Sequence, residues 1–432
     1  MSEGRAPGRP EPGRVPGSIT HLVDATMFWS ASGGGVRRYL LAKHAWLAGQ
    51  ADWRHTIAVP AVAGAPAAGA SDTATLPSWP LPGSGGYRLP VRRAAIARAL
   101  RALAPDLIEA GDPYRTAWAV RDVAGSLGIP AVAYCHSNLE TMARLAAGAR
   151  LGGAAARLAR RYARHVYAGF DLVLAPSRCL RQRLFEAGIA SAAWQPLGVD
   201  TGVFRPRGDP LAWRRSLGLA ADARVLVYAG RFAPEKHLGV LADAVERLGG
   251  RHVLVAIGAG PTPPPAGPRV RVLPFVASAA ALAEALAGAD AFVHAGDQET
   301  FGLSALEAMA CGTPVVVRDA EGLGELVADS GAGLAVGRGD GAAFAEAIAA
   351  VLAGDRERLA ARARAHAEAN DWRRVLPGLL GMYRRLLDRG GVAGATGPQA
   401  DRETLPAAAD GTARAPARPH LAAASPLRRQ PR

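Results

Sequence analysis

The sequence predicts an α/β protein with two domains, each built on a parallel β-sheet that helices cover on both faces. A chain of 432 residues is longer than one typical hydrophobic core requires. Short apolar runs that suit buried strands alternate with segments of helical periodicity, which is typical of parallel sheets. This alternation starts near residue 20 and starts again near residue 224, so we expect one sheet in each half.

Five segments follow from this pattern along the chain. We expect a tail at residues 1–18, a first domain at 19–198, a second domain at 199–370, a closing helix at 371–389 and a second tail at 390–432. Both tails are rich in Gly, Pro, Ala and Arg and lack apolar periodicity, so we expect them to be disordered.

The first domain is predicted to open with a strand at residues 20–27. A glycine triplet, Gly33, Gly34 and Gly35, then leads into an amphipathic helix, because only glycine turns this tightly and lets a ligand approach the backbone. A simple turn is the alternative interpretation. A helix at 92–103 and strands at 55–61, 106–110, 131–134 and 172–175 follow, with a long loop rich in Pro, Gly and Ser at 62–90.

The second domain is predicted to open with a strand at residues 224–229, followed by Gly230, Arg231 and a helix from about residue 238. Further strands are expected at 252–257, 270–275 and 333–336, with a short helix at 282–286. Residues 341–370 have an Ala-rich helical composition. The closing helix contains Pro377, which predicts a kink or a break.

The most informative stretch of the second domain is residues 290–317. An apolar strand ends before a polar loop, and a helix marked by Leu303, Leu306 and Met309 then runs to Gly312. Glu299 therefore lies beyond the carboxyl end of a strand, where open α/β sheets bind ligands. The backbone amides that open this helix can face an anion; they belong to Phe301, Gly302 and Leu303.

The run ETFGLSALEAMACGTPVVV, which starts at Glu299, strongly resembles the E-x7-E element of family 4 retaining nucleotide-sugar glycosyltransferases. In that family the first Glu contacts hydroxyls of the donor sugar and the second contacts the ribose, which implies these roles for Glu299 and Glu307. The alternative, two solvated surface carboxylates, is weakened because the match includes the glycines and Pro314. The resemblance implies a GT-B fold, in which two Rossmann-like domains face each other across a cleft and a C-terminal helix crosses back to the first domain.

Further motifs resemble the same family. The run GRFAPEK places Gly230, Arg231 and Lys236 in a G-R-x-x-x-x-K element, whose two cations grip the donor diphosphate. Fixed cations stabilise the charge that grows on a leaving phosphate. The resemblance also implies that His136 lies near the donor sugar, although a purely structural histidine is the alternative. It implies that the Gly33–Gly35 loop reaches the donor phosphate or the acceptor.

The resemblance predicts a retaining, metal-independent hexosyltransferase without a cofactor, which uses a GDP- or UDP-linked sugar. Mannose is the preferred sugar, and the acceptor is a lipid or saccharide hydroxyl in cell-envelope glycolipid or polysaccharide synthesis. The alternatives are a GT-B epimerase or phosphorylase, a catalytically dead scaffold, and a basic nucleic-acid-binding protein. The last is disfavoured because aromatic residues make up only 6% of the chain and are scattered.

The net charge of +14 favours an anionic partner. Residues 141–170 contain no acidic residue, and four arginines there share one helical face: Arg157, Arg160, Arg161 and Arg164. Another face carries Leu151, Leu158, Tyr162 and Val166. This pattern is typical of a helix that docks on anionic lipid, with an ordinary packed helix as the alternative. Because no run approaches a membrane span, we expect a cytoplasmic protein, with peripheral contact at the inner face of the membrane as a further hypothesis.

Overall fold

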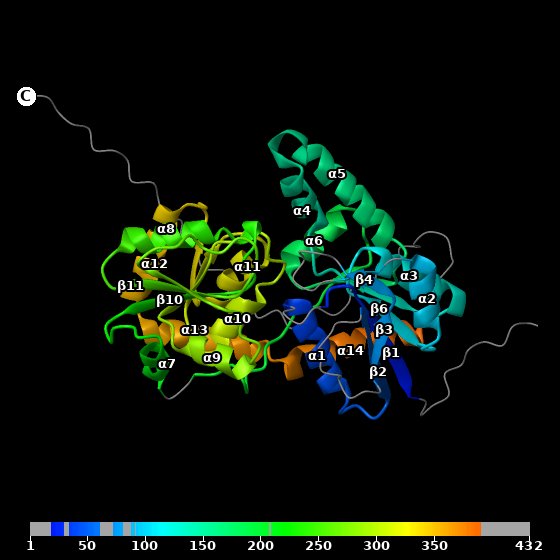
Figure 1. The fold of residues 1–432 in the computed structure, drawn as a ribbon. Coiled ribbons are helices and arrows are strands. Elements are labelled where there is room, and N and C mark those ends of the chain that lie inside the picture. The colour runs from blue at the N-terminus through cyan, green and yellow to red at the C-terminus, as the bar shows by residue number, and fades with distance from the viewer. Residues whose placement is uncertain are drawn as a thin grey trace, which may run out of the picture. The chain divides into compact units, whose positions relative to one another are not determined.

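The computed structural model describes residues 19–29, 34–60, 72–80, 88–90, 92–206 and 209–389. Two separate parallel sheets with flanking helices confirm the predicted two-part α/β fold (Figure 1). The predicted tails at 1–18 and 390–432 lie outside the described residues. Within these ranges, no helix combines the length and the apolar character needed to cross a membrane.

The first sheet has seven strands in the order β3-β2-β1-β6-β7-β8-β9. Every neighbouring pair is parallel, and β1 lies between β2 and β6. Its strands are β1 (Thr20–Ala25), β2 (Trp53–Pro60), β3 (Thr73–Leu76), β6 (Leu107–Ala110), β7 (Ala131–Tyr134), β8 (Leu172–Ala175) and β9 (Ala192–Trp194). The helices of this half are α1 (Gly35–Leu47), α2 (Arg93–Arg101), α3 (Arg115–Leu127), α4 (Leu139–Ala146), α5 (Gly148–Tyr167) and α6 (Arg178–Glu186).

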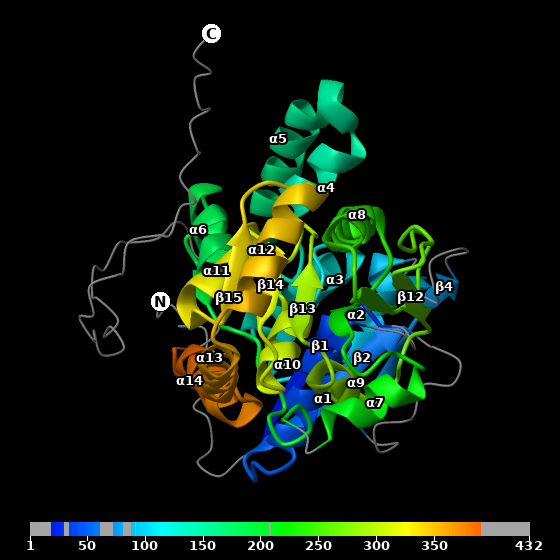
Figure 2. The ribbon, with the colours of Figure 1, turned by 90° about the vertical axis from the view of Figure 1, so that its left-hand side faces the viewer.

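The second sheet has six parallel strands in the order β12-β11-β10-β13-β14-β15. Its strands are β10 (Arg224–Ala229), β11 (His252–Ile257), β12 (Val270–Leu273), β13 (Ala291–His294), β14 (Val315–Arg318) and β15 (Gly333–Val336). Its helices are α7 (Pro210–Ser216), α8 (Leu238–Leu248), α9 (Ala279–Ala287), α10 (Leu303–Ala310), α11 (Glu321–Ser330), α12 (Gly341–Ala353) and α13 (Arg356–Ala369), and Figure 2 shows this half facing the viewer. In both sheets the chain order reverses beside the first strand.

Three details differ from the predictions. The loop predicted at 62–90 contains β3 and a short antiparallel pair, β4 (Ser78–Pro80) with β5 (Arg88–Pro90); its residues 62–71 and 81–87 lie outside the described ranges. The helical region predicted at 341–370 is two helices, because Asp355 caps a new helix with its side chain. Finally, α14 (Trp372–Asp388) continues through Pro377 without a break.

The chain passes between the two halves twice, near residues 199 and 371, and these two segments lie side by side. Val199 forms a parallel bridge with Asp371, and its amide donates to the Asn370 carbonyl at 3.0 Å. A Cβ atom on Gly198 would stand 2.8 Å from the Trp372 ring, so glycine serves here to allow close approach of the two segments.

The closing helix α14 packs on the first half, as the resemblance implied. Tyr383 reaches a buried charge network, where its hydroxyl donates to Glu109. The Lys43 ammonium lies 2.7 Å from Asp24 Oδ2 and 3.0 Å from Glu109 Oε1, and His55 Nε2 lies 2.8 Å from Asp24. Burial raises the pKa of Glu109 to about 6. Burial also acts to raise the pKa of Asp24, but its interactions with Lys43 and His55 keep that pKa below its usual value.

Candidate functional site

The candidate site lies where the strand order of the second sheet reverses. β10 lies between β11 and β13 and pairs with both. After β10 the chain continues to β11 on one side, and after β13 it continues to β14 on the other side. The loops that follow β10 and β13 therefore start at neighbouring strand ends and run in opposite directions. Loops that follow such a pair of strands diverge and leave backbone groups free for a ligand. Gly230 and Arg231 follow β10, and the loop that contains Glu299 follows β13.

Glu299 is held by two groups of its own half. The Lys236 ammonium donates to Glu299 Oε1, and His294 Nε2 lies 3.3 Å from the same oxygen. The Gly296 amide donates to His294 Nδ1 at 3.1 Å, so the ring proton resides on Nε2 and faces Glu299. Burial would raise the pKa of Glu299, but the Lys236 charge and the His294 contact hold it well below its usual range. Glu299 is therefore an ionised acceptor at neutral pH.

Glu307 lies in α10, and its side chain is only 2% exposed. One carboxylate oxygen accepts from Arg38 of α1, in the first half of the chain, and the other is buried without a hydrogen-bond partner among the described residues. Burial raises the pKa of Glu307, and the Arg38 charge offsets only part of this effect. The free oxygen leaves capacity to accept a hydrogen bond from a ligand hydroxyl.

His136 follows β7 at the edge of the first sheet that faces the Glu299 loop. Its backbone carbonyl accepts from Thr300 Oγ1 at 3.1 Å, so it lies next to the residue that follows Glu299. The ring stacks on Tyr134 with centroids 4.3 Å apart, and its Nε2 is buried without a partner in the described structure. Burial, and to a lesser extent the Lys43 charge, lowers the pKa of His136 to about 3, so the ring is neutral.

Arg231, the other cation of the motif, is much more exposed than Lys236. Its side chain is 62% exposed and pairs with Glu235 at 3.0 Å, whereas Lys236 is buried against Glu299. The Tyr228 hydroxyl donates to the Arg231 carbonyl at 2.8 Å and fixes the turn. A Cβ atom on Gly230 would lie 2.8 Å from that hydroxyl oxygen, which explains the glycine.

The glycine-rich loop of the first half reaches the same region. Gly33 lies outside the described residues, while Gly34 and Gly35 precede and open α1. A Cβ atom on Gly35 would lie 3.7 Å from the Leu303 side chain, so this loop adjoins the start of α10. Phe301 and Leu303 are each 9% exposed, and Gly302 between them has a φ of 94°, in the left-handed region that favours glycine.

The structure thus brings together most of the predicted site residues, from both halves of the chain. Sequence analysis missed Arg38 and His294. Arg38 lies three residues after Gly35, and His294 directly follows the apolar run at 291–293 that predicted a strand. Among the described residues, no group of three or more His, Cys, Asp or Glu side chains is arranged to hold a metal ion.

The four arginines predicted to dock on lipid all lie on α5 and are exposed. Arg160 forms a two-point ion pair with Glu140 of α4, at 2.7 and 2.9 Å. The apolar face identified in the sequence is only partly buried: Val166 is fully buried, whereas Leu151 and Leu158 are 66% and 69% exposed. These leucines are therefore not core residues, and the alternative of an ordinary packed helix does not hold for this part of α5.

Comparison with known protein families gives two matches. The model described as Glycosyltransferase Family 4 matches residues 33–203, and the model described as Glycosyl transferases group 1 matches residues 223–354. A GDP-mannose-dependent alpha-(1-6)-phosphatidylinositol dimannoside mannosyltransferase of Mycobacterium tuberculosis is 32% identical over 316 residues, which cover 71% of this chain and 80% of that protein. A D-inositol 3-phosphate glycosyltransferase of Geodermatophilus obscurus is 40% identical over 209 residues, 44% of this chain and 46% of that protein.

Solved structures share the fold. Sucrose-phosphate synthase from Thermosynechococcus elongatus superposes with a TM-score of 0.71 at 21% identity, covering 86% of this chain and 100% of that one. Anabaena HepE in complex with UDP and glucose superposes with a TM-score of 0.66 at 18% identity, covering 85% of this chain and 99% of that one.

Proposed function

Because the chain belongs to the family 4 glycosyltransferases and is therefore a retaining nucleotide-sugar glycosyltransferase of GT-B fold, we propose that it transfers mannose from GDP-mannose to a hydroxyl of a glycolipid headgroup. The names of its mannosyltransferase relatives support both the donor and the lipid acceptor. Cell-envelope glycolipid synthesis is the corresponding role.

The observation that carries this proposal is the ionised Glu299 at the end of β13, between Lys236 and His294. A fixed carboxylate is suited to accept hydrogen bonds from sugar hydroxyls, and Lys236 beside it is suited to a diphosphate oxygen. Glu307, with one unpartnered oxygen, would accept from the ribose hydroxyls. Arg231, whose side chain is mostly exposed, would turn from Glu235 to the diphosphate.

In the reaction we propose, the acceptor hydroxyl attacks the anomeric carbon from the face that the diphosphate leaves, and a leaving phosphate oxygen takes the hydroxyl proton. Lys236, Arg231 and the amides of Phe301 to Leu303 stabilise the charge that develops on the diphosphate. Neutral His136 would accept or donate a hydrogen bond at the sugar without adding charge. Because these groups provide the electrostatic stabilisation, transfer is expected to continue in EDTA.

The first test is a thermal-shift panel of GDP, UDP, ADP and their sugars. Binding at a hundredfold excess over the dissociation constant stabilises the folded state by about 2.7 kcal/mol, so GDP and GDP-mannose should raise the melting temperature clearly. Lys236→Gln should reduce transfer from GDP-mannose by roughly a hundredfold or more, which is typical for loss of a group that stabilises transition-state charge. Lack of any nucleotide shift in folded protein, or full transfer by Lys236→Gln, would contradict the proposal.

A lipid acceptor requires contact with a membrane, and the hairpin of α4 and α5 is suited to provide it. Figures 1 and 2 both show the hairpin extending away from the seven-stranded sheet. No residue of α4 is buried. Five large apolar side chains of the hairpin are exposed: Met142, Leu145, Leu151, Leu158 and Tyr162. Arg157, Arg161 and Arg164 lie on the same exposed helix. Apolar side chains beside arginines suit an anionic bilayer, in which leucines enter the acyl region and arginines contact phosphates.

Vesicle co-sedimentation tests this docking surface. Vesicles with phosphatidylserine should bind the protein at low salt, and neutral phosphatidylcholine vesicles should bind it several-fold less. The double variant Arg157→Gln with Arg161→Gln should weaken binding about 30-fold, because each surface arginine contributes about 1 kcal/mol. The double variant Leu151→Ser with Leu158→Ser should weaken binding at least tenfold, because burying a leucine side chain contributes about 1.5–3 kcal/mol. Arg358→Gln, on the exposed surface of α13, is the matched control. Equal binding of all variants would exclude the hairpin as the docking surface.

A further inference from the structure

Glu321, the first residue of α11, has an unusual backbone conformation. Its φ is 47°, in the left-handed region that costs energy for any residue with a Cβ atom. Its side chain is only 7% exposed. A strained, buried glutamate persists only when the surrounding structure holds it, and such strain is concentrated at functional sites.

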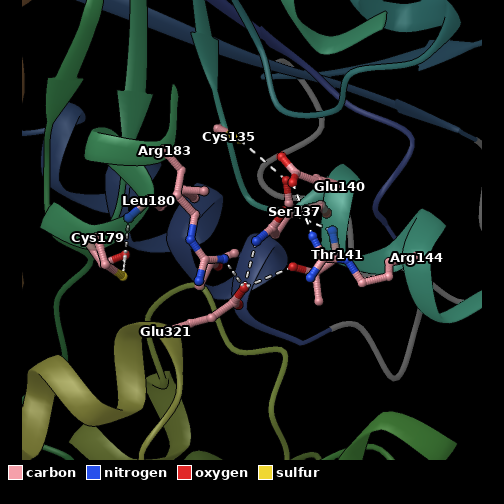
Figure 3. A network of polar contacts seen from close by, with 12 residues as sticks. Cys135, Ser137, Glu140, Thr141, Arg144, Cys179, Leu180, Arg183 and Glu321 are labelled. Carbon is pink, nitrogen blue, oxygen red and sulfur yellow. Dashed lines mark hydrogen bonds and ion pairs between the residues drawn. The ribbon is translucent and has the colours of Figure 1, made fainter. Parts of the chain in front are cut away.

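Within the described structure, the side-chain hydrogen bonds of Glu321 all go to the first half of the chain. Figure 3 shows its carboxylate among side chains of the first half. Its Oε1 accepts from Asn138 Nδ2 at 2.6 Å, from Arg183 Nη1 at 2.7 Å and, more weakly, from Thr141 Oγ1 at 3.4 Å. Its Oε2 is buried without a hydrogen-bond partner in the described structure. Asn138 also caps α4, and it lies two residues after His136.

The backbone next to Glu321 rests on the loop of Glu299. The Gly322 amide donates to the Glu299 carbonyl at 2.9 Å. A Cβ atom on Gly322 would stand 2.6 Å from Phe301 Cα, so glycine is required for this close approach. The side chain of residue 321 therefore reaches the His136–Asn138 segment, while the backbone supports the loop that carries Glu299.

We propose that Glu321 is a positioning residue that holds the His136 segment of the first half in register with the Glu299 loop of the second; this rests on the proposed function of that loop. Two contacts would set the register: Glu321 with Asn138, and Thr300 with the His136 carbonyl. Misplacement by about 1 Å can reduce catalysis a hundredfold, so a two-point connection between the segments that carry His136 and Glu299 matters for the reaction.

The test compares Glu321→Gly with Asp329→Asn. Glycine adopts the left-handed conformation freely, so Glu321→Gly removes the side chain without imposing strain. Asp329 also pairs with the first half, at 2.7 Å from Arg178, but it lies two helical turns farther along α11, about 12 Å from Glu321. It therefore controls for weakening of the contact between the halves alone.

We expect Glu321→Gly to lower kcat for transfer about 10- to 100-fold, while the dissociation constant for GDP stays within twofold of the wild type. Asp329→Asn should keep kcat within twofold. Glu321→Gln, which still accepts from Asn138, should recover kcat to within about fivefold of the wild type. Arg183→Gln removes another hydrogen-bond donor to Glu321 and should lower kcat several-fold. The Arg183 side chain is half exposed, so this change is tolerated by the fold.

Three outcomes would overturn the proposal. They are undiminished transfer by Glu321→Gly, equal losses in Glu321→Gly and Asp329→Asn, and a loss of GDP affinity as large as the loss of kcat. A failure of the proposed function looks different, because the wild type itself would then show neither a nucleotide-induced thermal shift nor transfer.

Discussion

At the residue scale, His136 makes a pH-dependent contribution to stability. Its folded pKa, about 3, lies below the value of about 6.5 in the unfolded chain, so the unfolded chain takes up the proton first as the pH falls. The stability that neutral His136 supports is therefore present above pH 6.5 and is lost progressively below it. Between pH 7.5 and 5.5 this one group accounts for about 1.4 kcal/mol of unfolding free energy.

The prediction is that His136→Phe reduces the difference in unfolding free energy between pH 7.5 and 5.5 by about 1.4 kcal/mol. Phenylalanine can keep the stacking on Tyr134 and cannot titrate. Urea unfolding at both pH values measures the difference, and His165→Phe, which removes an exposed ring, is the control. An unchanged difference in His136→Phe would show that the ring is not held neutral.

Sequence analysis singled out Glu299, Glu307, Lys236 and His136, because the stretches around them resemble motifs of the family. It did not identify their partners. Arg38 and Glu307 are 269 positions apart, and only the folded chain shows that they form an ion pair. It also grouped Arg231 with Lys236, whereas the structure buries one and exposes the other. Spacing along a chain determines which side chains share a loop, and packing determines which of them meet.

At the element scale, the start of α10 depends on the conformation of Gly302. A methyl group there would lie 2.6 Å from Leu323 Cδ2, and the φ of 94° is costly for alanine. Gly302→Ala is expected to lower the unfolding free energy by about 1–3 kcal/mol and to reduce transfer at least tenfold, because the amides beside it move. The control is Gly239→Ala in α8, where a Cβ atom meets nothing within 4 Å. It should gain about 0.5–1 kcal/mol, and equal effects of both changes would contradict this account.

Most strands and helices were predictable, because the spacing of apolar residues reflects which face of a strand or helix is buried. The strand β3 was not, since it lies in a stretch whose Pro, Gly and Ser content indicated a loop, and it forms by pairing with the edge of β2. Pro377 was expected to bend or break α14. The helix continues because Val375, Leu376, Leu379 and Leu380 around it are buried, and tertiary packing outweighs one lost hydrogen bond.

At the scale of the whole molecule, α14, the last described helix, packs against the core of the first half of the chain. Tyr383→Phe would leave a Glu109 oxygen without its donor in a fully buried network, which is expected to cost about 1–3 kcal/mol of unfolding free energy. Tyr162→Phe is the control, because the Tyr162 side chain is 37% exposed and water can replace its hydroxyl bond to the Pro113 carbonyl. Urea unfolding should show a loss below about 1 kcal/mol for Tyr162→Phe. Losses of equal size would show that the network does not hold α14.

The division into two sheets was predictable from chain length and from the repeated start of the strand–helix alternation. The contacts between the halves were not, and the sequence analysis did not single out the acidic residues of α11 that make them, Glu321, Glu325 and Asp329. In the structure, Glu325 accepts from the Arg178 and Cys179 amides at 2.9 and 3.0 Å, at the start of α6. Surface patterning alone cannot distinguish a solvated charge from one that meets another part of the chain.

The two lysines of the chain give it an unusual chemical property. Lys43 and Lys236 are 1% and 7% exposed, and each is engaged by carboxylates. With no other lysine in the sequence, the native protein offers amine-directed reagents no exposed lysine. Mass spectrometry of protein treated with an acylating reagent would therefore report local unfolding. Acylation of Lys236 would show that the loop at Glu299 has become exposed. Acylation of Lys43 would show that the core of the first half has opened. The same scarcity makes lysine-based immobilisation and cross-linking poor choices for handling this enzyme.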